Sequence, residues 1–156
     1  MVLCIAELYE SGGREIVRRL SERMGMPYCD LDQDPNANAS GAGIVLDSCA
    51  RYEGSREDGY RVLLHSSVQY RAGQLAQGGS LSPEDAERQI LRHDRERALQ
   101  FGTKTGRKWP DYSGCDLAVD TEKLGVAATV ELLVQFVALM TMHRRRREPA
   151  SWGGSR

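Results

Sequence analysis

The chain alternates short apolar runs with longer stretches in which apolar residues recur every three or four positions. Short apolar runs bounded by turn residues indicate buried strands, and the longer period indicates amphipathic helices. The apolar runs predict strands at residues 2–6, 27–30, 60–66 and 115–120. The periodic stretches predict helices after the turn at 10–13, then at 43–52, 67–77 and 82–101, and from Gly125 onward. Because strands alternate with helices, the pattern predicts an α/β fold of three layers, with a mostly parallel four-stranded sheet and helices on both faces.

Residues 2–15 place a strand, a glycine turn and the start of a helix in succession. This geometry suits phosphate, because backbone N–H groups and the positive end of the helix dipole point at the anion. Measured against the P-loop pattern G-x-x-x-x-G-K-[ST], Gly12 can be the second glycine. Glu7 stands at the first glycine, Gly13 at the lysine and Arg14 at the Ser/Thr position. An ordinary strand–turn–helix without a phosphate site is the alternative interpretation.

The predicted helix at 82–101 is rich in arginine. Arg88, Arg92 and Arg95 are spaced four and three apart, so they share one face. A row of guanidinium groups suits polyphosphate, because each group can grip two phosphate oxygens. Glutamates on the same helix leave a solvated surface with internal ion pairs as the alternative.

Composition narrows the class of protein. The 156 residues are 40% hydrophobic and 28% charged, with a net charge of −1, which suggests one globular domain without a nucleic-acid partner. We also expect no membrane partner, because no uninterrupted apolar run reaches the about 18 residues of a span. No signal peptide is evident, so we expect a cytoplasmic protein. The four cysteines are scattered without a C-x-x-C pair, which favours reduced thiols and no metal site.

Two motifs at opposite ends of the chain resemble one family. Tyr9 to Ile16, YESGGREI, is similar to the opening turn Y-G-S-G-G-R-E-I of the cytidylate-kinase-like proteins, which are P-loop nucleoside monophosphate kinases. That turn already lacks the P-loop lysine. Residues 93–125 resemble the lid-to-last-strand region of the same family. The matching positions there are Asp94, Arg97, Thr105-Gly106, Trp109, Asp116-Leu117, Asp120 and Leu124-Gly125. Gly41-Ala42 with Leu46 is a weaker third match, to G-R-G-A…L.

The resemblance implies a P-loop NTPase-like fold and ATP-dependent phosphoryl transfer to CMP or dCMP, with ATP and Mg²⁺ as cofactors. The kinase-like domain would span residues 1–143, with a lid at about 82–112 and a basic, flexible Gly/Ser-containing tail at 144–156. A homodimer is left open. The resemblance implies cofactor-binding residues Ser11, Gly12, Gly13, Arg14 and Arg71. It implies catalytic lid residues Arg92, Arg95 and Arg97.

The chain also departs from the family pattern. Glu10 replaces a glycine and puts a carboxylate beside the anion site, so Glu10→Gly should tighten nucleotide binding. Ser40 stands where the family has an arginine. Between the second strand and that position only a polar loop at 31–40 remains, so we expect the third strand and the acceptor-binding helices to be missing. The alternatives are therefore a degenerate nucleotide-binding or regulatory module without kinase activity, and a purely structural role.

Overall fold

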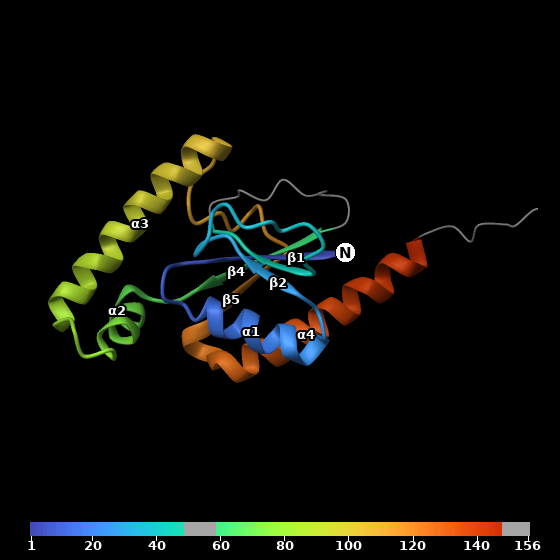
Figure 1. Ribbon diagram of the computed structural model, residues 1–156, viewed down its shortest axis with the longest axis horizontal. Coiled ribbons are helices and arrows are strands. Elements are labelled where there is room, and N and C mark those ends of the chain that lie inside the picture. Colours follow the sequence, from blue (N-terminus) through green and yellow to red (C-terminus); the bar gives the residue numbers. More distant parts are fainter. Residues whose placement is uncertain (49–58, 148–156) are drawn as a thin grey trace, which may run out of the picture.

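The computed structural model describes residues 1–48 and 59–147, which form an α/β fold around one parallel sheet. The strands are β1 (Val2–Glu7), β2 (Tyr28–Asp30), β3 (Ile44–Leu46), β4 (Gly59–His65) and β5 (Leu117–Asp120). The helices are α1 (Gly13–Met24), α2 (Val68–Ala76), α3 (Pro83–Thr105) and α4 (Thr121–Arg147). The sheet has five strands in the order β2-β3-β1-β4-β5, and every pair is parallel (Figure 1). The predicted fold class is confirmed.

The prediction of a helix at 43–52 is wrong for its first part. Ile44, Val45 and Leu46 are fully buried and form β3, which pairs with β1 on one side and β2 on the other. A central strand buried on both faces reads as a continuous apolar run, which periodicity cannot distinguish from a short helix. The third strand is therefore present, and the prediction of four strands is also wrong. Residues 49–52, and the predicted charged turn up to 58, lie outside the described residues.

The main hydrophobic core lies between the sheet and the pair α1 and α4. Side chains of α1 and α4, including Leu20 and Leu133, pack there against Leu3, Ile5 and Leu64 of the central strands. Figure 1 shows α1 and α4 side by side along this face of the sheet. On the other face, the described chain contributes the loop at 31–43, the loop at 106–116 and the C-terminal end of α3.

Helices α2 and α3 pack on each other rather than on the sheet. Ala72, Ala86 and Ile90 form their small shared core. In Figure 1 this pair stands beyond the carboxyl ends of the strands, which is the region where ligands bind in open parallel sheets. The position of α3 next to the glycine turn therefore decides which of its side chains reach the candidate site.

The predicted start of a helix at residue 82 is confirmed, although the helix limits differ. The Ser82 hydroxyl accepts a hydrogen bond from the Asp85 N–H at 3.1 Å, and Pro83 opens α3. Helix α3 continues to Thr105 and ends at Gly106 with φ 70°, so it extends into the predicted loop. Helix α4 starts at Thr121, before Gly125, whose φ of 76° kinks it.

Helix α4 changes the expectation about membranes. It continues to Arg147, beyond the predicted domain limit, and an 18-residue window in it has a mean hydropathy of 1.8 with 22% of the window buried. Within the described residues it is the one helix long and apolar enough to cross a membrane by length and composition. The sequence pattern concealed this because Glu131 and Gln135 interrupt the apolar run. Val130, Leu133 and Val137 belong to the main core, so α4 is part of the folded domain.

Candidate functional site

A cleft of about 270 Å³ lies at the carboxyl end of β1, between the glycine turn and α3. The turn and the first residues of α1 form one wall, and α3 forms the other. The loop after β2 closes one end. The lining residues are Glu7, Tyr9, Glu10, Gly12, Gly13, Arg14, Glu15, Asp32, His93 and Arg97. This is the position that the sequence predicted for a phosphate site, and the cleft brings together both cations and carboxylates.

The carboxylate of Glu7 fills the phosphate-binding turn. Its Oε2 accepts a hydrogen bond from the N–H of Gly13 at 2.7 Å, which is one of the free donors at the start of α1. A Cβ added to Gly13 would lie 2.6 Å from this carboxyl group, so a larger residue there would require the Glu7 side chain to move. The Glu7 carboxyl thus occupies the N–H of Gly13, one of the donors that the sequence predicted for a phosphate.

The surroundings of Glu7 disfavour its charged form. The pKa of Glu7 is raised to about 7, mainly by burial; the carboxylates of Asp32 and Glu10 act in the same direction, and the Gly13 N–H and Arg14 act against it. Near neutral pH the group therefore changes between an acid and a carboxylate. Such a perturbed group in a cleft is typical of functional sites, although ion-pair networks also produce it.

A hydrogen-bonded network joins three strand ends to α3. The Glu7 N–H donates to the Ser48 hydroxyl at 2.9 Å, and Ser48 donates through its N–H and hydroxyl to Asp32 at 2.8 and 2.5 Å. Arg97 of α3 donates to Asp32 at 3.1 Å, and both side chains are largely buried. The network fixes Arg97 over the cleft.

Arg71, predicted to bind the cofactor, is placed as a tie between elements. Its side chain is 3% exposed and pairs with both carboxylate oxygens of Asp94 at 2.8 and 2.9 Å. It also donates to the carbonyl oxygens of Ser66 at 3.1 Å and Tyr9 at 3.4 Å. Arg71 therefore connects the end of β4, the glycine turn and α3.

A stacked aromatic pair adds a second contact between the turn and α3. The rings of Tyr9 and His93 lie 3.8 Å apart and are nearly parallel, at 4°. The Nδ1 of His93 is buried without a hydrogen-bond partner. Burial lowers the pKa of His93, with Arg97 contributing in the same direction, so the ring stays neutral to lower pH than a free histidine.

The other residues predicted to bind the cofactor, Ser11, Gly12 and Arg14, lie in or next to the glycine turn. The Ser11 hydroxyl is buried and lies 2.9 Å from that of Ser66, away from the cleft. Gly12 has φ 89° and directly precedes α1. Arg14 lines the cleft and pairs with Asp30 at 3.3 Å. The structure thus brings Gly12, Gly13 and Arg14 together with Arg97.

The structure separates the three predicted lid arginines. Arg92 and Arg95 lie with Arg88 on the outer face of α3, where they line a different, open groove. Arg92 is 3.8 Å from Glu96, within the helix. Arg97 instead shares the inner face with His93, one helical turn away. In this arrangement, Arg97 alone among the three lines the cleft beside the turn.

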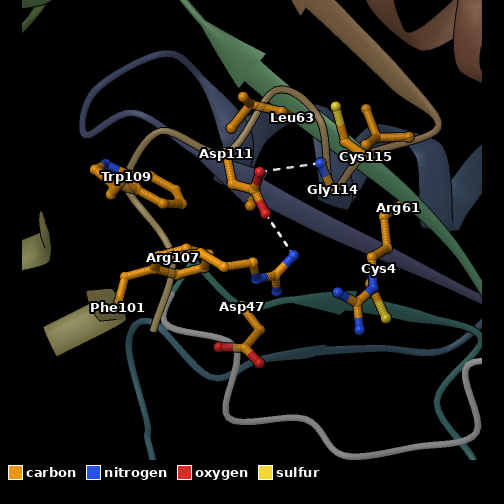
Figure 2. Close-up of a pocket in the computed structure, with 12 residues that line it drawn as sticks. Cys4, Asp47, Arg61, Leu63, Phe101, Arg107, Trp109, Asp111, Gly114 and Cys115 are labelled. Carbon is orange, nitrogen blue, oxygen red and sulfur yellow. Dashed lines mark hydrogen bonds and ion pairs between the residues drawn. The ribbon is translucent and has the colours of Figure 1, made fainter. Parts of the chain in front are cut away.

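A second pocket, of about 70 Å³, lies on the sheet face opposite α1 and α4 (Figure 2). Figure 2 shows Arg61 and Arg107 extending toward its centre, with Arg107 paired to Asp111. Burial raises the pKa of the Cys4 thiol in its wall to about 11, so this thiol is unreactive. The pocket has about a quarter of the volume of the cleft at the glycine turn, so it is the poorer candidate for a nucleotide.

Glu10 adopts a backbone conformation that favours glycine. Its φ is 66°, in the left-handed region. Among the described residues, Glu10 is the only one other than glycine that has a positive φ. A side chain there costs about 1–2 kcal/mol. Glu10→Gly is expected to raise the free energy of unfolding by up to about 1 kcal/mol, after the entropy of glycine in the unfolded chain is subtracted. Urea denaturation measures this, and Glu10→Ala, which keeps the Cβ, should show no such gain.

Comparison with solved structures agrees with this fold. A gluconokinase from Sinorhizobium meliloti has a TM-score of 0.64 at 14% identity, with 95% of this chain and 97% of that one covered. The YorR protein from Bacillus subtilis, solved in complex with phosphorylated GDP, has a TM-score of 0.58 at 13% identity, with 92% and 99% covered. An uncharacterized protein from Eubacterium ventriosum has a TM-score of 0.76 at 13% identity, with 88% and 98% covered.

These similarities, together with the strand order and the glycine turn, define a P-loop kinase-like fold. The sequence pattern of the cytidylate kinase-like family matches residues 33–123, which is more than half of the chain. The chain belongs to the cytidylate kinase-like family. No curated protein sequence matches it significantly.

The turn as it is folded does not fit a nucleoside triphosphate. A phosphate oxygen that accepted a hydrogen bond from the Gly13 N–H would take the position of Glu7 Oε2, which lies 2.7 Å from that nitrogen. The nearby carboxylates of Glu10 and Asp32 would repel the phosphate further. A nucleotide phosphate therefore requires Glu7 to leave the turn.

Sequence reasoning missed Asp32 and His93, which line the cleft, and Ser48, which holds Asp32 by hydrogen bonds. Asp32 and Ser48 follow the ends of β2 and β3, so the rule that sites form at carboxyl strand ends would have found them. Ser48 was lost because Ile44–Leu46 was predicted as helix. His93 gave no sequence signal of its own, since its contact with Tyr9 depends on how α3 docks.

Proposed function

We propose that this chain is a degenerate kinase-like module without phosphoryl-transfer activity of its own. The observation that carries this proposal is the Glu7 carboxylate, which accepts the Gly13 N–H at 2.7 Å in the position of a nucleotide phosphate. The module keeps the fold of its family and replaces the phosphate with one of its own side chains. Its role is then regulatory or interactive rather than catalytic.

Other features support the same proposal. Phosphoryl transfer depends on cations placed around the transferred group, because charge stabilisation and positioning supply nearly all of the catalysis. Here Arg92 and Arg95 lie on the outer face of α3, and Arg71 is paired with Asp94. Arg97 lines the cleft but is paired with Asp32. The cations beside the turn, Arg14, Arg71 and Arg97, are thus engaged by carboxylates of the same chain.

ATP-dependent phosphorylation of CMP or dCMP is the second candidate function. Family membership favours it, as does Arg97, which stands over the same cleft as Gly12 and Gly13. In this alternative, ATP with Mg²⁺ would bring the phosphoryl group, and Glu7 would have to withdraw first. A cytoplasmic location and a homodimer remain predictions of the sequence.

A coupled assay with ATP, Mg²⁺ and a panel of nucleoside monophosphates tests the proposal. We expect no turnover of CMP, dCMP, UMP or AMP above the background without protein, under conditions in which an active cytidylate kinase is readily detected. The second candidate would be established instead if CMP is turned over, if Arg97→Ala abolishes this activity, and if the matched outer-face variant Arg88→Ala keeps it.

A further inference from the structure

Helix α4 presents an apolar stripe that nothing in the described chain covers. Its members after the kink at Gly125 recur at spacings of seven and three residues, so they lie along one side of the helix. The large exposed side chains of the stripe are Leu132, Leu139 and Met142. Leu139 and Met142 are 65% and 55% exposed, which is high for apolar side chains on consecutive turns. An exposed apolar surface of this kind marks an interaction site.

The helical layer formed by α1 and α4 carries a net positive charge. Helices α1 and α4 together carry nine arginines and lysines against four glutamates, whereas the whole chain has a net charge of −1. Four consecutive arginines, 144–147, follow the stripe directly. Glu131, the acid beside Leu132, is paired with Arg23 of α1 at 3.2 Å. The stripe is therefore bordered by net positive charge on the helical face of the molecule.

We propose that the α1–α4 face docks on an anionic lipid surface. The stripe inserts between lipid headgroups, while arginines 145–147 and the basic rim of α1 contact the acidic headgroups, as in interfacial amphipathic helices. Helix α4 lies along the surface and does not cross it, because Val130, Leu133 and Val137 on its other side belong to the main core. A second copy of the chain is a poorer partner, since symmetric docking would bring two positive faces together.

Vesicle co-sedimentation of the full chain tests this proposal, with phosphatidylcholine vesicles compared with vesicles containing phosphatidylglycerol. We expect binding to the anionic vesicles alone, weakened by added salt. Arg145→Gln with Arg146→Gln should weaken it about 30-fold, from about 1 kcal/mol for each charge. Lys104→Gln with Lys108→Gln, away from this face, is the matched control and should leave binding unchanged.

The apolar contribution is tested in the same assay. Leu139→Ser should weaken binding about 10-fold, whereas Leu99→Ser, at an equally exposed leucine on α3, should not. Circular dichroism is expected to show unchanged folding in all variants, because each side chain is exposed. Light scattering after gel filtration gives the mass. Absence of vesicle binding at low salt overturns the proposal. So does a dimer that is dissociated by Leu139→Ser while no vesicle binding is seen. Losses of binding in the two control variants that equal those in the test variants overturn it as well.

Discussion

Glu7→Gly is expected to bind ATP with Mg²⁺ about 10-fold more tightly than the unmodified chain at pH 8. The substitution removes the carboxylate that now accepts the Gly13 N–H and restores the first glycine of the P-loop pattern. At pH 8 the Glu7 carboxyl, whose pKa is about 7, is mostly ionised, and protonating it to relieve the repulsion of a phosphate costs about 1.4 kcal/mol, which is a factor of about 10. Isothermal titration calorimetry at fixed salt measures the difference.

Two further variants separate the possible causes of that gain. Glu7→Gln removes the charge but keeps an oxygen that can still accept the Gly13 N–H, so it should recover only part of the affinity. Glu22→Gln removes one charge from the exposed side of α1 and should change little. If the unmodified chain already binds ATP as tightly as Glu7→Gly, Glu7 does not obstruct the turn, and the proposed loss of kinase activity loses its main support.

The obstacle in the turn has a different origin from the one that the sequence emphasised. Both Glu7 and Glu10 depart from glycine, and the sequence pointed to Glu10 because the family resemblance covers it. The structure shows that Glu10 mainly strains the backbone, with φ 66°, while the Glu7 side chain enters the turn. While Glu7 remains there, Glu10→Gly should tighten nucleotide binding only slightly. Which acid folds inward depends on backbone direction, and composition does not reveal it.

Local signals in the sequence were sufficient for the elements that carry strong end markers. The strand–turn–helix at 2–15 and the Ser82-Pro83 start of α3 were predicted correctly, because capping and glycine turns are decided by neighbouring residues. β3 was not, because Ile44, Val45 and Leu46 are as apolar in a buried strand as in a buried helix. Its assignment depends on pairing with Leu3 and Tyr28, which is a tertiary property.

The arginines on α3 show the same difference between local signals, which the sequence reveals, and tertiary contacts, which it does not. Helical spacing correctly placed Arg88, Arg92 and Arg95 on one face. It could not show which face meets the turn, because that is decided by contacts of α3 with distant residues. Asp94 binds Arg71 and His93 stacks on Tyr9, which turns Arg97 inward and the other arginines outward. Residues that fix a helix in place can therefore exclude its most conspicuous charges from a site.

The pKa of Glu7 also predicts a pH dependence of stability. In the unfolded chain the carboxyl loses its proton near its ordinary pKa of 4.5, but in the folded chain the pKa is raised to about 7. Between these values the folded state binds one more proton, so stability falls as pH rises. The full difference is about 3 kcal/mol, from 1.36 kcal/mol for each pKa unit. His93 acts in the opposite direction, because its lowered pKa reduces stability as pH falls.

Comparison with Glu7→Gln isolates the contribution of Glu7, because His93 is common to both proteins. Below pH 4.5 Glu7 is protonated in both states, so the two proteins should have similar free energies of unfolding. At pH 8 the unmodified chain holds an ionised carboxylate among Asp32 and Glu10, and the glutamine variant should be more stable by about 3 kcal/mol. Urea denaturation from pH 4 to pH 8 measures this difference, with Glu22→Gln as the control at an exposed carboxylate. A difference between Glu7→Gln and the unmodified chain that stays constant over this range would show that the Glu7 carboxyl is not held in the turn.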